Sequence, residues 1–171
     1  MEEATTGGRA LFFVDIAHFV PAPFLGFLGS LIRIFIRAPA GRKRFNVFGA
    51  LNAITDQLIT VTNDTYINAE SVCDLLRQIA GLNLGFPMTL VMDPARDQKC
   101  KIVWQLASVL AIELLYLPTY CPNLNRIEGF WKFLPKKCLY SKYDSEFSAF
   151  KNAIIDCLSQ TYTSYKQELD S

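Results

Sequence analysis

Three acidic residues, Asp15, Asp93 and Glu128, have types and positions that could do chemistry. Asp15 and Asp93 each end a short apolar run, at residues 11–14 and 88–92, of the kind that forms a buried strand. If these strands are neighbours, their carboxyl ends place two carboxylates side by side. Like charges so close repel, and a bridging divalent cation offsets the repulsion. Hard carboxylate oxygens suit Mg²⁺ or Mn²⁺ better than zinc.

Glu128 is the candidate for a third ligand, supplied by a helix that packs against the edge of the sheet. Three carboxylates can hold two ions, which steady both the attacking and the leaving oxygen of a phosphodiester. Each residue also has a purely structural interpretation. An Asp after a strand commonly caps a helix or a turn. Glu128 follows Asn125 by three residues, the spacing of a capping box. Spacing alone leaves both interpretations open.

The elements that must position these residues begin with an antiparallel meander. Strands are expected at residues 11–14, 45–51 and 57–62, with a further strand possible at 31–36. Residues 52–56 join two of these runs as a hairpin. The apolar stretch 19–36 is interrupted by Pro and Gly, which argues against a membrane-spanning helix.

The second half of the chain alternates helices with strands. From Asn68 to Gly81 the apolar residues recur at helical spacing. Further elements are expected as a strand at 88–92, a helix at 99–110, a strand at 112–117, and helices near 126–134 and 145–168. A strand, helix, strand order implies parallel strands. The predicted fold is therefore α/β, with a mixed central sheet of three antiparallel strands followed by parallel strands, flanked by helices.

Length and composition fit one compact domain, since 171 residues that are 51% hydrophobic can form a single core. The 17 basic and 16 acidic residues nearly cancel, so any DNA contact must depend on local clusters. The five cysteines are irregularly spaced, which favours reduced cysteines that pack rather than a structural zinc site. The N-terminal residues lack a secretory signal, so a cytoplasmic protein is expected.

Three blocks of sequence carry a family resemblance. They are residues 13–15 (Phe-Val-Asp), 90–96 (Leu-Val-Met-Asp-Pro-Ala-Arg) and 115–131 (Leu-Tyr-Leu-Pro-Thr-Tyr-Cys-Pro-Asn-Leu-Asn-Arg-Ile-Glu-Gly-Phe-Trp). Together they resemble the mariner-type DDE transposases, specifically their bacterial insertion-sequence branch. The 34 residues from 94 to 127, between the second Asp and the Glu, are a separation typical of this group. The resemblance covers roughly residues 10–140 and implies an RNase H-like catalytic domain over 11–140, after a short leader at 1–10 and before a C-terminal helix in 141–171.

The resemblance implies that Asp15, Asp93 and Glu128 are catalytic and hold two Mg²⁺ or Mn²⁺ ions. The ions would activate water, and then a DNA 3′-hydroxyl, for attack on phosphodiesters during excision and integration. The implied partners are element ends, target DNA and a second copy of the chain. Complete relatives carry helix-turn-helix modules ahead of this domain, and only about ten residues precede the first strand here. A separately encoded N-terminal half is one way to supply them.

Contacts with DNA phosphates would come from two basic clusters. One comprises Arg42, Lys43 and Arg44, and the other comprises Lys132, Lys136 and Lys137. A solvated charged surface is the alternative interpretation for each residue. His18 is expected to be a packing or hydrogen-bonding residue, and Phe130 and Trp131 are expected to be core anchors rather than base-stacking surfaces.

Several positions depart from the family pattern. Pro94 stands where the family usually has Asn, which removes an amide side chain and a backbone donor beside the metals. Thr119, Cys121 and Arg126 also replace usual residues, and Pro135 is expected to kink or end its helix. These departures leave open a truncated or degenerate copy, or a non-catalytic RNase H-like module that binds DNA or dimerises. The block 115–131 argues against a third class, another RNase H-like nuclease such as a resolvase.

Overall fold

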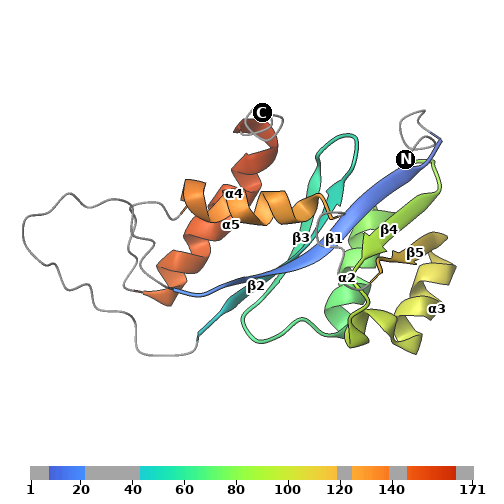
Figure 1. The fold of residues 1–171 in the computed structure, drawn as a ribbon, viewed down its shortest axis with the longest axis horizontal. Coiled ribbons are helices and arrows are strands. Elements are labelled where there is room, and N and C mark those ends of the chain that lie inside the picture. The colour runs from blue at the N-terminus through green and yellow to red at the C-terminus, as the bar shows by residue number, and fades with distance from the viewer. Residues whose placement is uncertain (1–7, 22–42, 119–124, 139–145, 165–171) are drawn as a thin grey trace, which may run out of the picture.

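A computed structural model of the chain describes residues 8–21, 43–118, 125–138 and 146–164, without the side chains of 96–97, 136–138 and 161–164. Its elements are β1 (Ala10–Phe19), β2 (Phe45–Asn52), β3 (Leu58–Asn63), α2 (Ala69–Ala80), β4 (Met88–Met92), η1 (Arg96–Lys99), α3 (Lys101–Val109), β5 (Ile112–Tyr116), α4 (Ile127–Cys138) and α5 (Phe147–Ser164) (Figure 1). This order confirms the predicted alternation of strands and helices. The possible strand at 31–36 lies outside the described residues.

The five strands form one mixed sheet in the order β3-β2-β1-β4-β5. β3, β2 and β1 pair in antiparallel fashion, while β1, β4 and β5 are parallel. β1 therefore occupies the centre of the sheet (Figure 1). The crossovers to β4 and β5 run through α2 and α3, as parallel strands require. The predicted fold class is confirmed.

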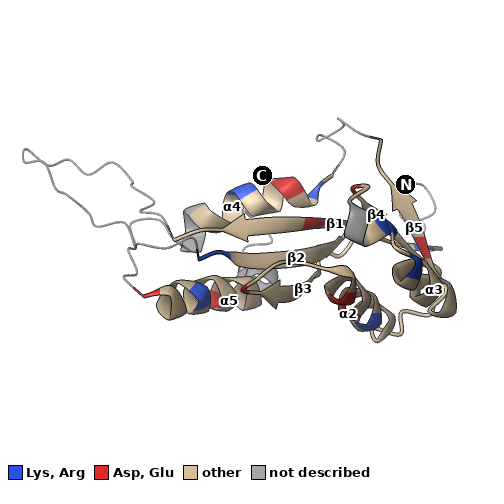
Figure 2. Ribbon diagram, turned by 90° about the horizontal axis from the view of Figure 1, so that it is seen from below, with Lys and Arg blue, Asp and Glu red and all other residues tan. Residues whose placement is uncertain are grey.

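Alternate residues of β1 point into two separate cores, because side chains on a strand alternate between its faces. Phe12 and Val14 are fully buried with residues of α2 and α3. Phe13 and Ala17 pack instead with residues of α4 and α5. α4 lies on one face of the sheet, and α2 and α3 lie on the other (Figure 2). Asp15 falls in the second set, so the alternation places it on the face that α4 covers.

Helix α2 lies where it was predicted, and the structure adds a side-chain cap at its start. The Asn68 side chain caps it by accepting a hydrogen bond from the Ser71 N–H at 3.0 Å. The Gly81 N–H closes the other end by donating to the carbonyl of Arg77 at 2.9 Å. The expected apolar face is buried in the core, through Val72, Leu75, Leu76 and Ile79.

Strand β1 is longer than predicted. It was expected to end at Asp15, but it continues to Phe19. The extension is stabilised by β2, which pairs with β1 as far as the Phe19 and Phe45 pair, whereas β4 pairs only as far as Val14 and Met92. Asp15 thus lies where β1 loses one of its two neighbours, not at the end of the strand.

Pro135 does not end α4, which continues to Cys138. A proline inside a helix removes one backbone hydrogen bond, here the one to the carbonyl of Trp131. Phe130 and Leu134 are almost fully buried in the core beside it. Packing of this apolar face therefore stabilises the helix through the proline.

One cysteine differs from expectation. Cys157 in α5 is disulfide-bonded, so the prediction of reduced cysteines is wrong for this residue. Cys73 in α2 is a buried free thiol, as predicted. Disulfide formation depends on Cα atoms lying within roughly 4–7 Å of each other, which sequence spacing does not reveal.

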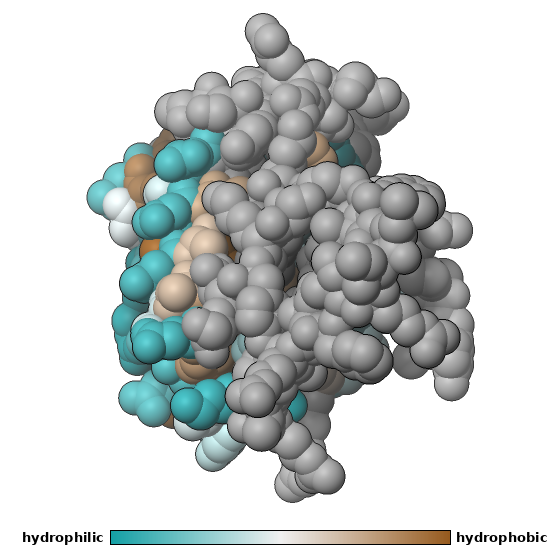
Figure 3. Space-filling model, turned by 90° about the vertical axis from the view of Figure 1, so that its left-hand side faces the viewer, coloured by the Kyte–Doolittle hydropathy of each residue, from teal (hydrophilic) through white to brown (hydrophobic). Residues whose placement is uncertain are grey.

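No helix in the described ranges is long and apolar enough to cross a bilayer. The described residues visible at one end of the molecule place hydrophilic side chains next to hydrophobic ones (Figure 3). Such mixing is usual at a protein surface, of which apolar atoms contribute more than half.

The α2 core allows a test of the fold. Leu76→Ala removes a fully buried side chain and should lower the free energy of unfolding by about 2–5 kcal/mol, since the lost apolar contacts leave a cavity. Urea denaturation would measure the loss. Gln78→Ala, at an exposed position of the same helix, should change the free energy little. Equal losses in the two variants would contradict this packing.

Candidate metal centre

Asp15 and Asp93 occupy equivalent positions on adjacent parallel strands. The last β1·β4 pair is Val14 with Met92. Asp15 follows Val14 within β1, and Asp93 follows Met92 directly after the end of β4. Neighbouring strands lie about 4.8 Å apart. The structure therefore brings the two positions together as predicted, with Asp15 half-buried and Asp93 exposed.

Glu128 lies in the first turn of α4 and is half-buried. The helix holds this position because Ile127 and Phe130, on either side of Glu128, are buried against the sheet. Asp15 is on the face of β1 that α4 covers. The helix thus brings the third acidic residue toward the first.

The pKa of Asp15 is affected by both of the other carboxylates. This pKa is raised from 3.8 to about 6, chiefly by burial, although a hydrogen bond with the Ile16 backbone opposes the rise. The negative charges of Asp93 and Glu128 contribute smaller parts of this rise, while His18 lowers the pKa. Both partner carboxylates therefore act on Asp15 through space.

The three carboxylates do not form a closed ligand cluster in the described part of the chain. No group of three His, Cys, Asp or Glu side chains there lies close enough to hold one ion. The donor set nevertheless fits Mg²⁺ or Mn²⁺, because it consists of hard oxygens whose mutual repulsion a cation would offset. Binding of one ion by all three would require the carboxylates to lie closer together.

Asn125 ties the start of α4 to β1. Its Nδ2 donates to the carbonyl of Val14 at 3.2 Å, and the side chain is almost fully buried. Its Oδ1 has no hydrogen-bond partner among the described residues, so it does not cap the Glu128 N–H as a capping box would. The backbone carbonyl of Asn125 accepts that hydrogen bond instead, at 3.1 Å. The sequence places a polar residue three positions before Glu128, but its spacing did not predict this attachment to β1.

Arg126 gives α4 a second attachment. Its guanidinium donates to the carbonyl of Ala53 at 2.7 Å and lies 3.6 Å from a carboxylate oxygen of Asp56. Both partners belong to the turn between β2 and β3. Arg126, one of the residues that depart from the family pattern, therefore binds the hairpin.

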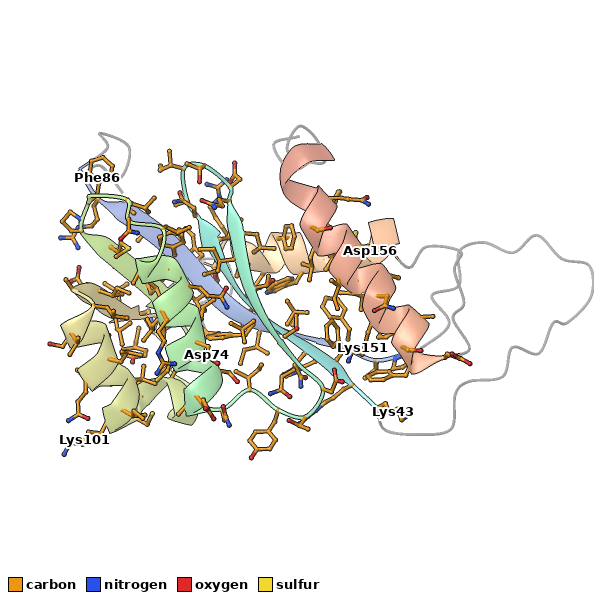
Figure 4. The ribbon with its side chains drawn as sticks, turned by 180° about the vertical axis from the view of Figure 1, so that it is seen from behind. Lys43, Asp74, Phe86, Lys101, Lys151 and Asp156 are labelled. Atoms are coloured by element: carbon orange, nitrogen blue, oxygen red, sulfur yellow. The ribbon has the colours of Figure 1, made fainter. Side chains whose placement is uncertain are left out.

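The predicted basic clusters divide in the structure. Lys132 is exposed one turn beyond Glu128 in α4. Lys43 lies over the ring of Phe147 beside the start of α5 (Figure 4), and Arg44 donates to the carbonyl of Thr65. Arg44 is roughly 17 Å along the strand direction from the position opposite Asp15. Arg42 and the side chains of Lys136 and Lys137 lie outside the described part.

The remaining predictions for individual side chains are confirmed. His18 shares a hydrogen bond of 2.7 Å with Asn46, joining β1 to β2. Phe130 is buried, and Trp131 packs edge-on against both Phe130 and Phe19. These aromatic residues anchor the core.

The sheet order and the flanking helices define an RNase H-like fold, shared with the catalytic cores of integrases and transposases. The Mos1 mariner paired-end complex with Mn matches with a TM-score of 0.60 and 11% identity, over 96% of this chain and 55% of that one. The HTLV-2 integrase catalytic core domain with magnesium matches with a TM-score of 0.57 and 13% identity, over 88% of this chain and 82% of that one. A simian T-cell lymphotropic virus intasome matches with a TM-score of 0.60 and 17% identity, over 88% of this chain and 47% of that one. The chain thus spans about half the length of two of these proteins.

The chain belongs to the DDE superfamily endonuclease family, which its residues 33–151 match. Asp93 and Glu128 lie within the matched segment, whereas Asp15 precedes it. The assignment of Asp15 to the site depends on the pairing of β1 with β4. No protein of curated function matches the sequence.

The pKa of Asp15 leads to a prediction for stability. In Asp15→Asn the buried charge is absent, so the metal-free variant should melt at a higher temperature than the wild type above pH 6. The folded pKa is raised, so the wild type gains stability as its Asp15 binds a proton between pH 6 and 3.8. The difference between the two proteins should therefore shrink over this interval and vanish below it.

Thermal unfolding from pH 8 to pH 3.5 in a chelator would measure this difference. Asp74→Asn, at an exposed position of α2, is the matched control and should not show this narrowing between pH 6 and 3.8. A constant difference between Asp15→Asn and wild type across the whole range would contradict the raised pKa.

Proposed function

We propose that this chain is the catalytic domain of a transposase that cuts and joins DNA with Asp15, Asp93 and Glu128 as metal ligands. The observation that carries the proposal is the placement of Asp15 and Asp93 directly after the last β1·β4 pair, with Glu128 in the first turn of α4, within an RNase H-like fold. Membership of the DDE superfamily endonucleases supports it independently. The sequence blocks at 90–96 and 115–131 favour the bacterial insertion-sequence branch.

Each of the three proposed ligands lies on a different kind of backbone element. Asp15 is held on a strand paired on its β2 side, so its backbone position is rigid. Asp93 begins a loop, and Glu128 closes the site from the helix above the sheet. Bound Mg²⁺ or Mn²⁺, proposed as two ions, would lower the pKa of water or of a DNA 3′-hydroxyl and stabilise the leaving oxygen. The three residues would orient the reacting phosphodiester between strand and helix.

The proposed partners are DNA and a second copy of the chain. Two similar structures motivate this proposal: the Mos1 transposase paired-end complex with the left transposon end, and the Mos1 strand transfer complex. Lys132 is the best-placed described residue for a phosphate contact, being exposed one turn from Glu128. A separately encoded helix-turn-helix half would supply recognition of the element ends.

A second function is a non-catalytic module that binds DNA or dimerises. Two observations favour it: Pro94 offers neither a backbone donor nor an amide beside Asp93, and the carboxylates in the described part are not close enough to hold one ion. The two functions differ in whether the purified protein breaks phosphodiester bonds.

Nicking of supercoiled plasmid with Mn²⁺ or Mg²⁺ tests the proposal. The wild type should nick, chelator should abolish nicking, and Asp93→Asn should lower the rate by about 100-fold or more, since one ligand of the site is lost. Asp74→Asn removes an equivalent charge from exposed α2 and should nick like the wild type. Folded wild-type protein that does not nick, or nicks equally after Asp93→Asn, would favour the non-catalytic module.

DNA binding tests the role of Lys132. Lys132→Ala should weaken binding of duplex DNA and reduce the slope of log K against log salt by about 1, since one phosphate contact is lost. Lys101→Ala, an exposed lysine of α3 (Figure 4), is the control of equal charge and should leave the slope unchanged. Fluorescence anisotropy across a salt series gives both values. Equal slopes for wild type and Lys132→Ala would remove Lys132 from the contact surface.

A further inference from the structure

Gly49 on β2 lies directly opposite Asp15 of β1 in the sheet register. A Cβ atom at Gly49 would lie 2.6 and 2.7 Å from Cζ2 and Cη2 of Trp131, and 3.2 Å from Cδ1 of Ile127. Separations below 3.0 Å are not tolerated between carbon atoms, whose ordinary contact distance is about 3.5–4.0 Å. The indole of Trp131 therefore occupies the space that any side chain at this position would fill.

The backbone does not explain this glycine. Gly49 has no positive φ, unlike Gly85, and it lies inside a paired strand, where glycine weakens the sheet. Gly129 offers a contrast, because a Cβ atom there would meet nothing within 4 Å. Close approach of α4 to β2 is thus the feature that requires a glycine opposite Asp15.

Trp131 is held by shape rather than by a polar contact. Its ring meets Phe19 and Phe130 edge-on, at centroid distances of 6.5 and 5.2 Å. Its Nε1 is buried without a hydrogen-bond partner among the described residues. We therefore expect the indole to pack at one distance from the backbone of Gly49. Trp131 follows Glu128 by three residues, or about one helical turn, so that distance also sets the height of Glu128 above the sheet.

We propose that the contact between Gly49 and Trp131 is a positioning device for the metal site. It sets the distance from the first turn of α4 to β1, and therefore the distance from the Glu128 carboxylate to Asp15. Neither side chain is a metal ligand; both act through the placement of Glu128. The inference rests on the proposed function and adds to it two residues that no carboxylate motif contains.

The experiment compares five proteins: wild type, Gly49→Ala, Trp131→Phe, the double variant, and Gly129→Ala as the control. Mn²⁺ affinity is measured from the electron paramagnetic resonance signal of free Mn²⁺, and plasmid nicking is measured at saturating Mn²⁺. Circular dichroism establishes that each protein is folded. Gly129→Ala adds the same methyl group next to Glu128, but into open space.

Gly49→Ala should displace α4 by roughly 1 Å, because its methyl must reach ordinary contact distance from the indole. A displacement of this size is expected to lower the nicking rate by about 100-fold and to weaken Mn²⁺ binding. The double variant should regain most of both, since phenylalanine lacks the two indole atoms that the methyl meets. Gly129→Ala should match the wild type. Because relief of the clash would also restore stability, Mn²⁺ binding and nicking are compared at a temperature at which circular dichroism shows each variant to be fully folded.

Two results would overturn the positioning role. One is a folded Gly49→Ala protein that binds Mn²⁺ and nicks like the wild type, and the other is a folded double variant no better than Gly49→Ala. If Gly49→Ala does not fold, Trp131→Phe decides alone, because it only removes atoms. It should weaken Mn²⁺ binding, and wild-type affinity would overturn the role. A wild type that neither binds Mn²⁺ nor nicks would instead overturn the proposed function, and the positioning role with it.

Discussion

The pairing of β1 with two neighbours of different extent is the constraint on which the site depends. β2 accompanies β1 to Phe19, but β4 leaves after Met92. Asp93 begins the loop directly after Met92, and the side chain of Asn125 donates to the carbonyl of Val14 beside it. Because a buried carbonyl without a partner costs free energy, this hydrogen bond favours one place for the start of α4. Asp15, Asp93 and the start of the helix that carries Glu128 thus lie where the pairing of β1 with β4 ends.

The site opposes the stability of the fold. A half-buried carboxylate with two others acting on it is unfavourable, as the raised pKa of Asp15 shows. The fold tolerates it because each face of β1 is covered by its own apolar core, with α2 and α3 on one side and α4 and α5 on the other. Proteins commonly spend stability in this way at a functional site. A divalent cation would offset both the burial of this charge and the repulsion from Asp93 and Glu128, so the proposed chemistry would relieve the destabilising feature.

The departures from the family pattern have different structural consequences. Arg126 makes contacts of its own with the β2–β3 turn, and these attach the helix that carries Glu128. Pro135 lies within α4 without ending it, because buried Leu134 and its neighbours pack the helix onto the sheet. Nothing in the described part of the chain explains Pro94. Of the three, the residue next to Asp93 is therefore the one that bears on the choice between a catalytic and a non-catalytic domain.

The sequence alone determined the strands, the amphipathic face of α2 and the acidic residues that follow two apolar runs, because these depend on periodicity and on neighbours close in the chain. The tertiary structure decided what lies between distant residues: the extension of β1 past Asp15, the attachment of Asn125 to Val14, the disulfide of Cys157 and the fit of Trp131 over Gly49. Local patterns specify which face of an element is apolar. They do not specify the register and depth at which two elements meet, because those follow from the shapes of side chains that only packing brings together.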